Sequence, residues 1–297
     1  MVNYNVYLDF GRYNMKDDVK SKGFDLDDTF SITMELERPL LYNELKNEEF
    51  TKDEKNKNNN LIKIITGIIV ICIVGLFIWV NDTYKPQSLA KEALISDDTV
   101  EVKIDEFISF TPKKIEAKKG FIFYPGAKVE PESYAPLCRK VAEQGYKVVI
   151  VNMPMNLAIF SYNRGEKVID EYSNIKTWVV GGHSLGGTMA AKFASENIYV
   201  DGVVLLSSYP TGDELKDMGK KVLSIWGSKD GIVNFEKLIK SKEKLPQDTT
   251  YVEIEGANHS QFGDYGNQNG DDTPIINREK QIDIAAKDIV KFISEIK

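Results

Sequence analysis

The chain has 297 residues, of which 42% are hydrophobic and 28% are charged, a balance typical of globular proteins. Its formal net charge is −7 and it has no dense run of lysine and arginine, so we expect no nucleic-acid partner. The two cysteines, Cys72 and Cys138, and the two histidines are scattered along the chain. We therefore expect two free thiols, no metal site and no cofactor.

Residues 1–60 are polar and of mixed charge, and residues 51–60 have the composition of a solvated linker. The stretch 29–36 alternates weakly between apolar and polar residues, which is compatible with a strand. We predict a polar amino-terminal segment on the cytoplasmic side of a membrane, and the sequence assigns no function to it.

Residues 61–80 read LIKIITGIIVICIVGLFIWV, with a single charge at Lys63. An apolar run of about 20 residues matches the hydrocarbon thickness of a bilayer. A cleaved signal peptide would lie within about the first 30 residues, so we predict a transmembrane helix instead. Lysines are denser before the span than after it, which predicts a cytoplasmic amino end and an outside carboxyl part. The lysines concerned are Lys46, Lys52, Lys55 and Lys57 before the span and Lys85 and Lys91 after it.

After a predicted linker at 81–97, residues 98–297 are expected to form one α/β domain. Short apolar runs rich in β-branched residues alternate there with helical patterns. Strands are predicted at 106–111, 120–124, 147–153, 178–182, 202–207, 222–226 and 251–255. Helices are predicted at 133–144, at 184–197 and near the carboxyl end, where one face holds Ile282, Ala286, Ile289 and Ile293. This alternation predicts a mostly parallel, doubly wound sheet with helices on both faces.

The motif Gly181-Gly-His-Ser-Leu-Gly-Gly187 lies between a predicted strand and a predicted helix. It contains the pattern G-x-S-x-G, in which a sharp strand-to-helix turn exposes the serine hydroxyl. Small residues on both sides of the serine let the helix and the strand approach closely. Ser184 is therefore the candidate nucleophile.

A serine hydroxyl is a poor nucleophile unless a base removes its proton. His183 adjoins Ser184 and is expected to point away from its hydroxyl, so His259, in a loop after a predicted strand, is the candidate base. Asp230 follows another predicted strand and lies between the serine and the histidine in chain order, so it is expected to orient the imidazole. Two acidic residues of the preceding loop are rivals: Asp213 and Glu214.

Hydrolysis of an acyl compound places negative charge on the carbonyl oxygen, which backbone N–H groups must stabilise. Leu185, directly after the nucleophile, and Ala127, in the loop after strand 120–124, are the expected donors. Pro125 has no N–H and is excluded.

The interval 208–221 is too short for a helical cap, so an open site is predicted. Its lining is expected to include Met153, Met155, Leu157, Phe160 and Phe262, although ordinary packing explains these side chains equally well. The acidic loop 264–272 is expected to be solvated rather than to bind a cation.

Several blocks together resemble the α/β-hydrolase superfamily, in its fold-5 group near the dienelactone hydrolases: 123–129, 152–157, 181–187, 226–231 and 256–263. The resemblance covers roughly residues 100–297. It implies a triad of Ser184, Asp230 and His259 and activity on an ester-like bond. Dienelactone hydrolases use a cysteine where this chain has Ser184, so their particular substrate is not implied.

The main hypothesis is a membrane-anchored serine hydrolase that cleaves an ester of a small molecule or a lipid through an acyl-enzyme on Ser184. Acyl transfer to an alcohol or an amine by the same residues stays open as an alternative. A non-catalytic binding module with this fold is a third hypothesis. It predicts that a member of the triad is missing, and none is.

Overall fold

The structure of the protein, a computed structural model, describes residues 59–297. The predicted strand 29–36 and all but the end of the predicted polar segment 1–60 lie outside the described residues. The chain divides into two units, Met1–Ile73 and Val74–Lys297. Helix Asn59–Asn81 has 23 residues and a mean hydropathy of 2.9, so it is long and apolar enough to cross a membrane, and it contains the predicted span.

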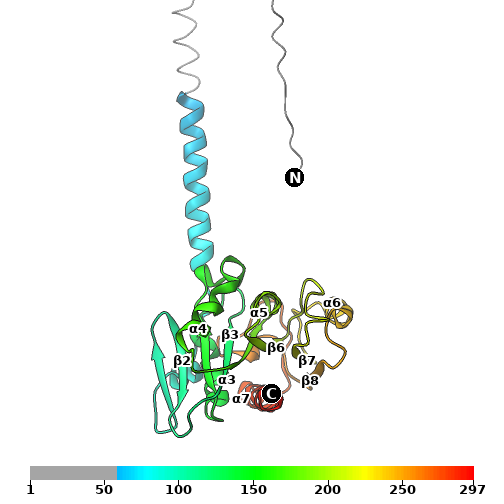
Figure 1. The fold of residues 1–297 in the computed structure, drawn as a ribbon. Helices are drawn as coiled ribbons and strands as arrows, with labels where there is room; N and C mark the ends of the chain where they lie inside the picture. The colour runs from blue at the N-terminus through cyan, green and yellow to red at the C-terminus, as the bar shows by residue number, and fades with distance from the viewer. Residues whose placement is uncertain (1–58) are drawn as a thin grey trace, which may run out of the picture. The chain divides into compact units, whose positions relative to one another are not determined.

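An eight-stranded sheet forms the centre of the Val74–Lys297 unit (Figure 1). Its strands are β1 (Val100–Ile104), β2 (Phe107–Pro112), β3 (Lys119–Tyr124), β4 (Lys147–Val151), β5 (Thr177–His183), β6 (Val200–Leu206), β7 (Lys221–Gly227) and β8 (Thr250–Ile254). They are ordered β1-β2-β4-β3-β5-β6-β7-β8. β2 pairs antiparallel with β1 and β4, and all other pairs are parallel. The predicted mostly parallel sheet is confirmed.

Helices cover both faces of this sheet (Figure 1). One face packs against α2 (Ser88–Ala93), α3 (Ala135–Ala142) and α7 (Arg278–Glu295), and the other against α4 (Gly165–Glu171) and α5 (Leu185–Glu196). α6 (Phe235–Lys240) follows β7. Short 3-10 turns complete the unit: η1 (Pro131–Tyr134), η2 (Pro154–Asn156), η3 (Ala158–Phe160), η4 (Tyr162–Arg164), η5 (Ser241–Lys244) and η6 (Ser260–Phe262).

The central strands are buried on both sides, as parallel strands between two helical layers must be. Every residue of β4 is buried, and in β3 only Lys119 is not. Each fully buried Val, Ile or Phe side chain stabilises the fold by about 1.5–3 kcal/mol. This packing fixes the strand ends, and with them the loops that carry the candidate site.

All seven predicted strands are present, with ends displaced by no more than two residues. The sequence pattern missed β1, a short edge strand whose sequence, VEVKI, alternates between apolar and charged residues in place of the continuous apolar run of a parallel strand. The predicted helix 133–144 begins as η1 and continues as α3. The apolar face predicted for the last helix is buried in α7, so that prediction is confirmed.

The segment that follows helix Asn59–Asn81 packs onto the domain. Tyr84 forms a bridge with Val129, and Ala90 and Ala93 of α2 are buried. Residues 207–220, between β6 and β7, form turns and contain no helix, as their small number led us to expect. Both cysteines are free, and burial raises the pKa of the Cys138 thiol well above its ordinary value.

Candidate active site

Four loops that follow parallel strands meet at one edge of the sheet. Ala127 follows β3, Ser184 follows β5, Asp230 follows β7 and His259 follows β8. Parallel strands have their carboxyl ends at the same edge, and this edge is where ligands bind in open α/β sheets. The sheet topology therefore brings these four residues, far apart in the sequence, to one side of the molecule.

Ser184 forms a sharp turn between β5 and α5. Its φ of +53° lies in a region that costs a residue other than glycine about 1–3 kcal/mol. The Ser184 N–H donates to Leu206 O at 3.0 Å. A Cβ on Gly186 would lie 2.2 Å from Tyr124 O, and one on Gly182 would lie 2.6 Å from the same atom. The glycines of the motif are therefore required by the contact between α5 and the end of β3.

Gly186→Ala is expected to destabilise the fold by about 3 kcal/mol or more, because the added methyl meets backbone that cannot swing aside. Thermal unfolding of the detergent-solubilised protein measures this change. Gly75→Ala is the matched control, because no atom lies within 4 Å of a Cβ at that position. An unchanged midpoint in Gly186→Ala would contradict the packing described.

Asp230 and His259 form a buried pair. His259 Nδ1 lies 2.9 Å from Asp230 Oδ2, and the two residues are 1% and 4% exposed respectively. Burial raises the pKa of Asp230, but the hydrogen bond and charge interaction that it receives from His259, together with hydrogen bonds from Ser207 and Val233, leave that pKa below its ordinary value. His259 Nε2 is buried and has no hydrogen-bond partner among residues 59–297. The rivals Asp213 and Glu214 are exposed.

His183 packs beside His259, with the two ring centroids 4.4 Å apart. Its Nδ1 lies 2.9 Å from the Tyr134 hydroxyl, which also accepts the Gly126 N–H at 3.1 Å. The Tyr134 hydroxyl thus links the backbone of Gly126 to the ring of His183. Burial, and then the neighbouring His259, lower the pKa of His183 well below its ordinary value. His183 is therefore neutral at neutral pH and places no positive charge beside His259.

Asp271 connects the loop of Asp230 to the loop of His259 by hydrogen bonds to backbone N–H groups. Its Oδ1 accepts the N–H groups of Gly231 at 3.1 Å and His259 at 3.2 Å, and its Oδ2 accepts the Ser260 N–H at 2.8 Å. Neither Asp271 nor Tyr134 was identified from the sequence, because each acts on backbone groups that only the folded chain brings near.

The acidic loop 264–272 is not simply solvated, so that expectation was wrong. Asp264 is 3% exposed, and its Oδ2 accepts the Ala90 N–H at 2.9 Å while Oδ1 lies 3.5 Å from Arg278 Nε. Charge and composition suggested exposure, but the fold uses two of these carboxylates as acceptors. No group of three or more His, Cys, Asp or Glu side chains in the described part of the chain is arranged to hold a metal ion.

Asp271→Ala is expected to speed hydrogen exchange at the amides of His259 and Ser260 by about tenfold or more, because each amide loses an acceptor bound by a charge-assisted hydrogen bond. Hydrogen–deuterium exchange with mass spectrometry, on the peptide that contains residues 259–260, reads this out. Asp272→Ala removes the neighbouring exposed carboxylate and should leave the exchange unchanged. Equal exchange in the two variants would contradict the hydrogen bonds from His259 N–H and Ser260 N–H to Asp271.

The candidate oxyanion donors lie where α5 meets the end of β3. Leu185 is the first residue of α5, so its N–H has no acceptor within the helix. The neighbouring N–H groups both have acceptors: the Gly126 N–H donates to the Tyr134 hydroxyl, and the Lys128 N–H donates to Asn156 O. The Ala127 N–H has no acceptor among the described residues. Both N–H groups are therefore available to a ligand.

The residues predicted to line the site differ in their exposure to solvent. Met153 is 6% exposed and Phe262 is fully buried, with its ring centroid 5.6 Å from that of His183. Leu157 is half-buried, whereas Met155 and Phe160 are 44% and 59% exposed. Phe262 thus packs beneath the histidines, and Met155 and Phe160 lie on the outer surface.

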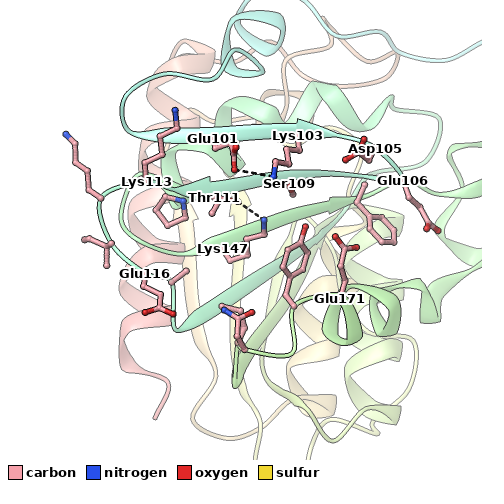
Figure 2. Close-up of a pocket in the computed structure, with 18 residues that line it drawn as sticks. Glu101, Lys103, Asp105, Glu106, Ser109, Thr111, Lys113, Glu116, Lys147 and Glu171 are labelled. Carbon is pink, nitrogen blue, oxygen red and sulfur yellow. Dashed lines mark hydrogen bonds and ion pairs between the residues drawn. The ribbon is translucent and has the colours of Figure 1, made fainter.

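A cavity of about 760 Å³ lies elsewhere, over β1, β2 and β4, and no member of the predicted triad lines it (Figure 2). Lys147 lies in it with its ammonium 2.7 Å from the Thr111 hydroxyl and 4.0 Å from the ring centroid of Tyr172. Burial lowers the pKa of Lys147 to about 8, although the nearby Glu171 acts in the opposite direction. At pH 7 this lysine is therefore charged, and its burial in the charged form lowers the free energy of unfolding.

Lys147→Met is expected to stabilise the fold by about 1–2 kcal/mol at pH 7, after allowance for the lost hydrogen bond. The unfolded chain holds the lysine proton up to a pH of about 10.4, whereas the folded chain releases it from about 8. Wild-type stability therefore rises with pH across this window, and the advantage of the variant should shrink there. Thermal unfolding at a series of pH values tests this, with Lys103→Met, at an exposed side chain of the same cavity, as the control.

Comparison with known proteins identifies the family. Residues 120–283, more than half of the chain, match the model of the alpha/beta hydrolase family. The chain belongs to the alpha/beta hydrolase family. The matched residues include the whole of the candidate triad, and this membership confirms the resemblance seen in the sequence. No curated protein matches the chain.

Solved structures resemble this alpha/beta hydrolase in fold. Est1E from Butyrivibrio proteoclasticus with ferulic acid bound has a TM-score of 0.50 and 14% identity, over 68% of this chain and 99% of that one. A soluble variant of monoglyceride lipase from Saccharomyces cerevisiae in complex with a substrate analog has a TM-score of 0.50 and 11% identity, over 73% and 97%. A dienelactone hydrolase-like promiscuous phosphotriesterase from metagenomic libraries has a TM-score of 0.49 and 14% identity, over 64% and 92%.

Proposed function

We propose that this chain is a membrane-anchored serine hydrolase that cleaves carboxylic esters through an acyl-enzyme on Ser184. The observation that carries the proposal is the buried 2.9 Å pair of His259 Nδ1 and Asp230 Oδ2, which leaves Nε2 free in a chain whose Ser184 occupies a strained strand-to-helix turn. The esterase and lipase names of proteins with similar folds agree with ester chemistry.

In the first half of the reaction, Ser184 Oγ attacks the carbonyl carbon of the ester and His259 Nε2 takes the hydroxyl proton. Asp230 orients the imidazole and stabilises its cation. The bond to the leaving alcohol then breaks, and His259 donates the proton to the alcohol oxygen. In the second half, water attacks the acyl carbon while His259 takes a proton from it; the bond from Ser184 Oγ to the acyl carbon then breaks, His259 returns the proton to Ser184 Oγ, and the acid leaves.

Both tetrahedral intermediates carry an oxyanion, which the N–H groups of Leu185 and Ala127 are proposed to stabilise. Losing one such donor costs about 2.7–4 kcal/mol in other hydrolases. Of the candidate lining residues, Met155 and Leu157 are proposed to contact the acyl or alcohol part of the substrate. Met153 and Phe262 are 6% and 0% exposed, and they are proposed to shape the site from within the core.

Helix Asn59–Asn81 is proposed to anchor the protein as a single membrane span. The excess of lysines before it supports a cytoplasmic amino end and a hydrolase domain outside. Trp79 near its carboxyl end suits the membrane–water interface, where tryptophan is enriched.

The test is an activity screen of the full-length protein in detergent against p-nitrophenyl esters of graded acyl length. We expect hydrolysis with an optimum in chain length and complete loss after treatment with a fluorophosphonate. If the protein neither hydrolyses any of these esters nor reacts covalently with the fluorophosphonate, the proposal is refuted.

A further inference from the structure

Three large apolar side chains are exposed on the turns that follow β4. Met155 is 44% exposed, Ile159 55% and Phe160 59%. We call these residues the apolar loop patch. Single exposed apolar residues are ordinary on protein surfaces, but a group of them within one short segment indicates a surface that is covered in use.

The loop that carries the patch is fixed in place. The Lys128 N–H donates to Asn156 O at 2.9 Å, and Ala158 is 1% exposed and packs in the core. Met155 and Asn156 both have positive φ, of 55° and 53°, which the surrounding packing must hold. The patch is therefore exposed because the fold presents it.

The loop that binds Asn156, residues 125–130, contacts the chain just after helix Asn59–Asn81. Tyr84 N–H donates to Lys128 O at 2.7 Å, and Glu130 N–H donates to Tyr84 O at 3.0 Å. The Lys128 ammonium lies 4.8 Å from the ring centroid of Trp79. From Asn81 to Tyr84 the extended chain spans at most about 10 Å. Lys128 and its partner loop are thus held close to the carboxyl end of the helix.

The candidate oxyanion loop is held by the same contacts, because Ala127 directly precedes Lys128. Three features therefore lie together on one side of the domain: the end of the apolar helix, the apolar loop patch and the Ala127 N–H.

We propose that the apolar loop patch enters the headgroup region of the bilayer crossed by helix Asn59–Asn81, so that the site faces the membrane surface and takes acyl esters of lipids held in that bilayer. This inference rests on the proposed function and adds a substrate class to it. Apolar side chains at this depth gain from leaving water, and an ester bond lies at the same depth in a bilayer lipid.

A membrane, rather than a partner protein, is the occupant that the structure favours. The proposed span tethers the domain to a bilayer through a short segment, so lipid is within reach of the patch, whereas a protein partner would have to be recruited from solution. A second copy of the chain is the main rival, and the experiment separates it from lipid.

The first measurement locates the patch in the membrane. Full-length protein is reconstituted in dioleoylphosphatidylcholine vesicles with an environment-sensitive fluorophore at Ile159→Cys, in a Cys72→Ala background. Ile198→Cys is the matched control: Ile198 is 82% exposed and precedes β6, so it lies at the opposite edge of the sheet from the site. We expect lipids with a nitroxide near the headgroup to quench the label at position 159 and not at 198.

The second measurement tests the substrate class. Ile159→Asp should lower hydrolysis of a fluorogenic diacyl phospholipid, placed in both leaflets, by about tenfold or more, since a charge opposes insertion. Hydrolysis of a soluble short-chain p-nitrophenyl ester should be unchanged, which also shows that the variant folds. Ile159→Leu and Ile198→Asp should behave as wild type on both substrates.

Absence of quenching at position 159, or equal quenching at 159 and 198, would overturn the inference. Cross-linking of two copies through Ile159→Cys without quenching would overturn it in favour of a dimer. If soluble esters are cleaved and Ile159→Asp cleaves the phospholipid normally, the inference fails while the proposed function stands. If no ester is cleaved by wild type, the proposed function and the substrate class both fail.

Discussion

Replacing Ser184 with alanine is expected to lower ester hydrolysis by a factor of about 10⁴–10⁶ and to abolish covalent labelling by a fluorophosphonate. The substitution removes only the hydroxyl group, whose Oγ carries the acyl group in the proposed acyl-enzyme. The positive φ of residue 184 remains, so the strain of the turn and the packing of α5 are unchanged. The thermal unfolding midpoint should therefore stay at its wild-type value while activity is lost.

Labelling is measured by in-gel fluorescence of the full-length protein, and the modified peptide is identified by mass spectrometry. Ser173→Ala, at an exposed serine away from the turn, should label as wild type does. Retained labelling of Ser184→Ala would place the nucleophile elsewhere and remove the basis of the proposed mechanism.

Asp230→Asn is expected to lower kcat by about 10⁴-fold with little change in KM. The amide is nearly isosteric, but it cannot stabilise an imidazolium, and its NH₂ group favours the wrong tautomer of His259. The lowered pKa of Asp230 means that the wild-type carboxylate stays ionised below the ordinary range of an aspartate. The defect should therefore persist across neutral pH.

Steady-state kinetics on a soluble ester give this result directly. Asp213→Asn is the control, because Asp213 was the rival from the sequence and is exposed. A large loss in Asp213→Asn together with near-normal kinetics in Asp230→Asn would show that the third residue was assigned wrongly.

The parallel strands were predictable because burial between two helical layers demands continuous apolar runs, such as Val148–Val151 in β4. β1 was not predicted because it is an antiparallel edge strand. Its Glu101 and Lys103 interrupt the apolar residues, and its burial falls from Val100 to the exposed Ile104, so it lacks the continuous apolar run that marks a buried parallel strand.

The candidate site was predictable to the extent that its chemistry is local in the sequence. The turn around Ser184 needs glycines at fixed positions, and strand-end loops single out Asp230 and His259. The supporting contacts were not predictable, because Asp271 and Tyr134 act through backbone N–H groups from distant loops. Apolar character suggested a pocket wall at both Phe262 and Phe160, but only the folded chain shows one buried and the other at the surface.

The turns at residues 207–220 bear on the choice between hydrolysis and acyl transfer. An enzyme that passes an acyl group to an alcohol must keep water from the acyl-enzyme while the acceptor binds, and a closing lid is one way to do so. This chain has no helical insertion between β6 and β7 to serve as such a lid. On the proposed mechanism, no helix inserted between β6 and β7 shields an acyl group on Ser184 from water, which favours release of a free acid over acyl transfer.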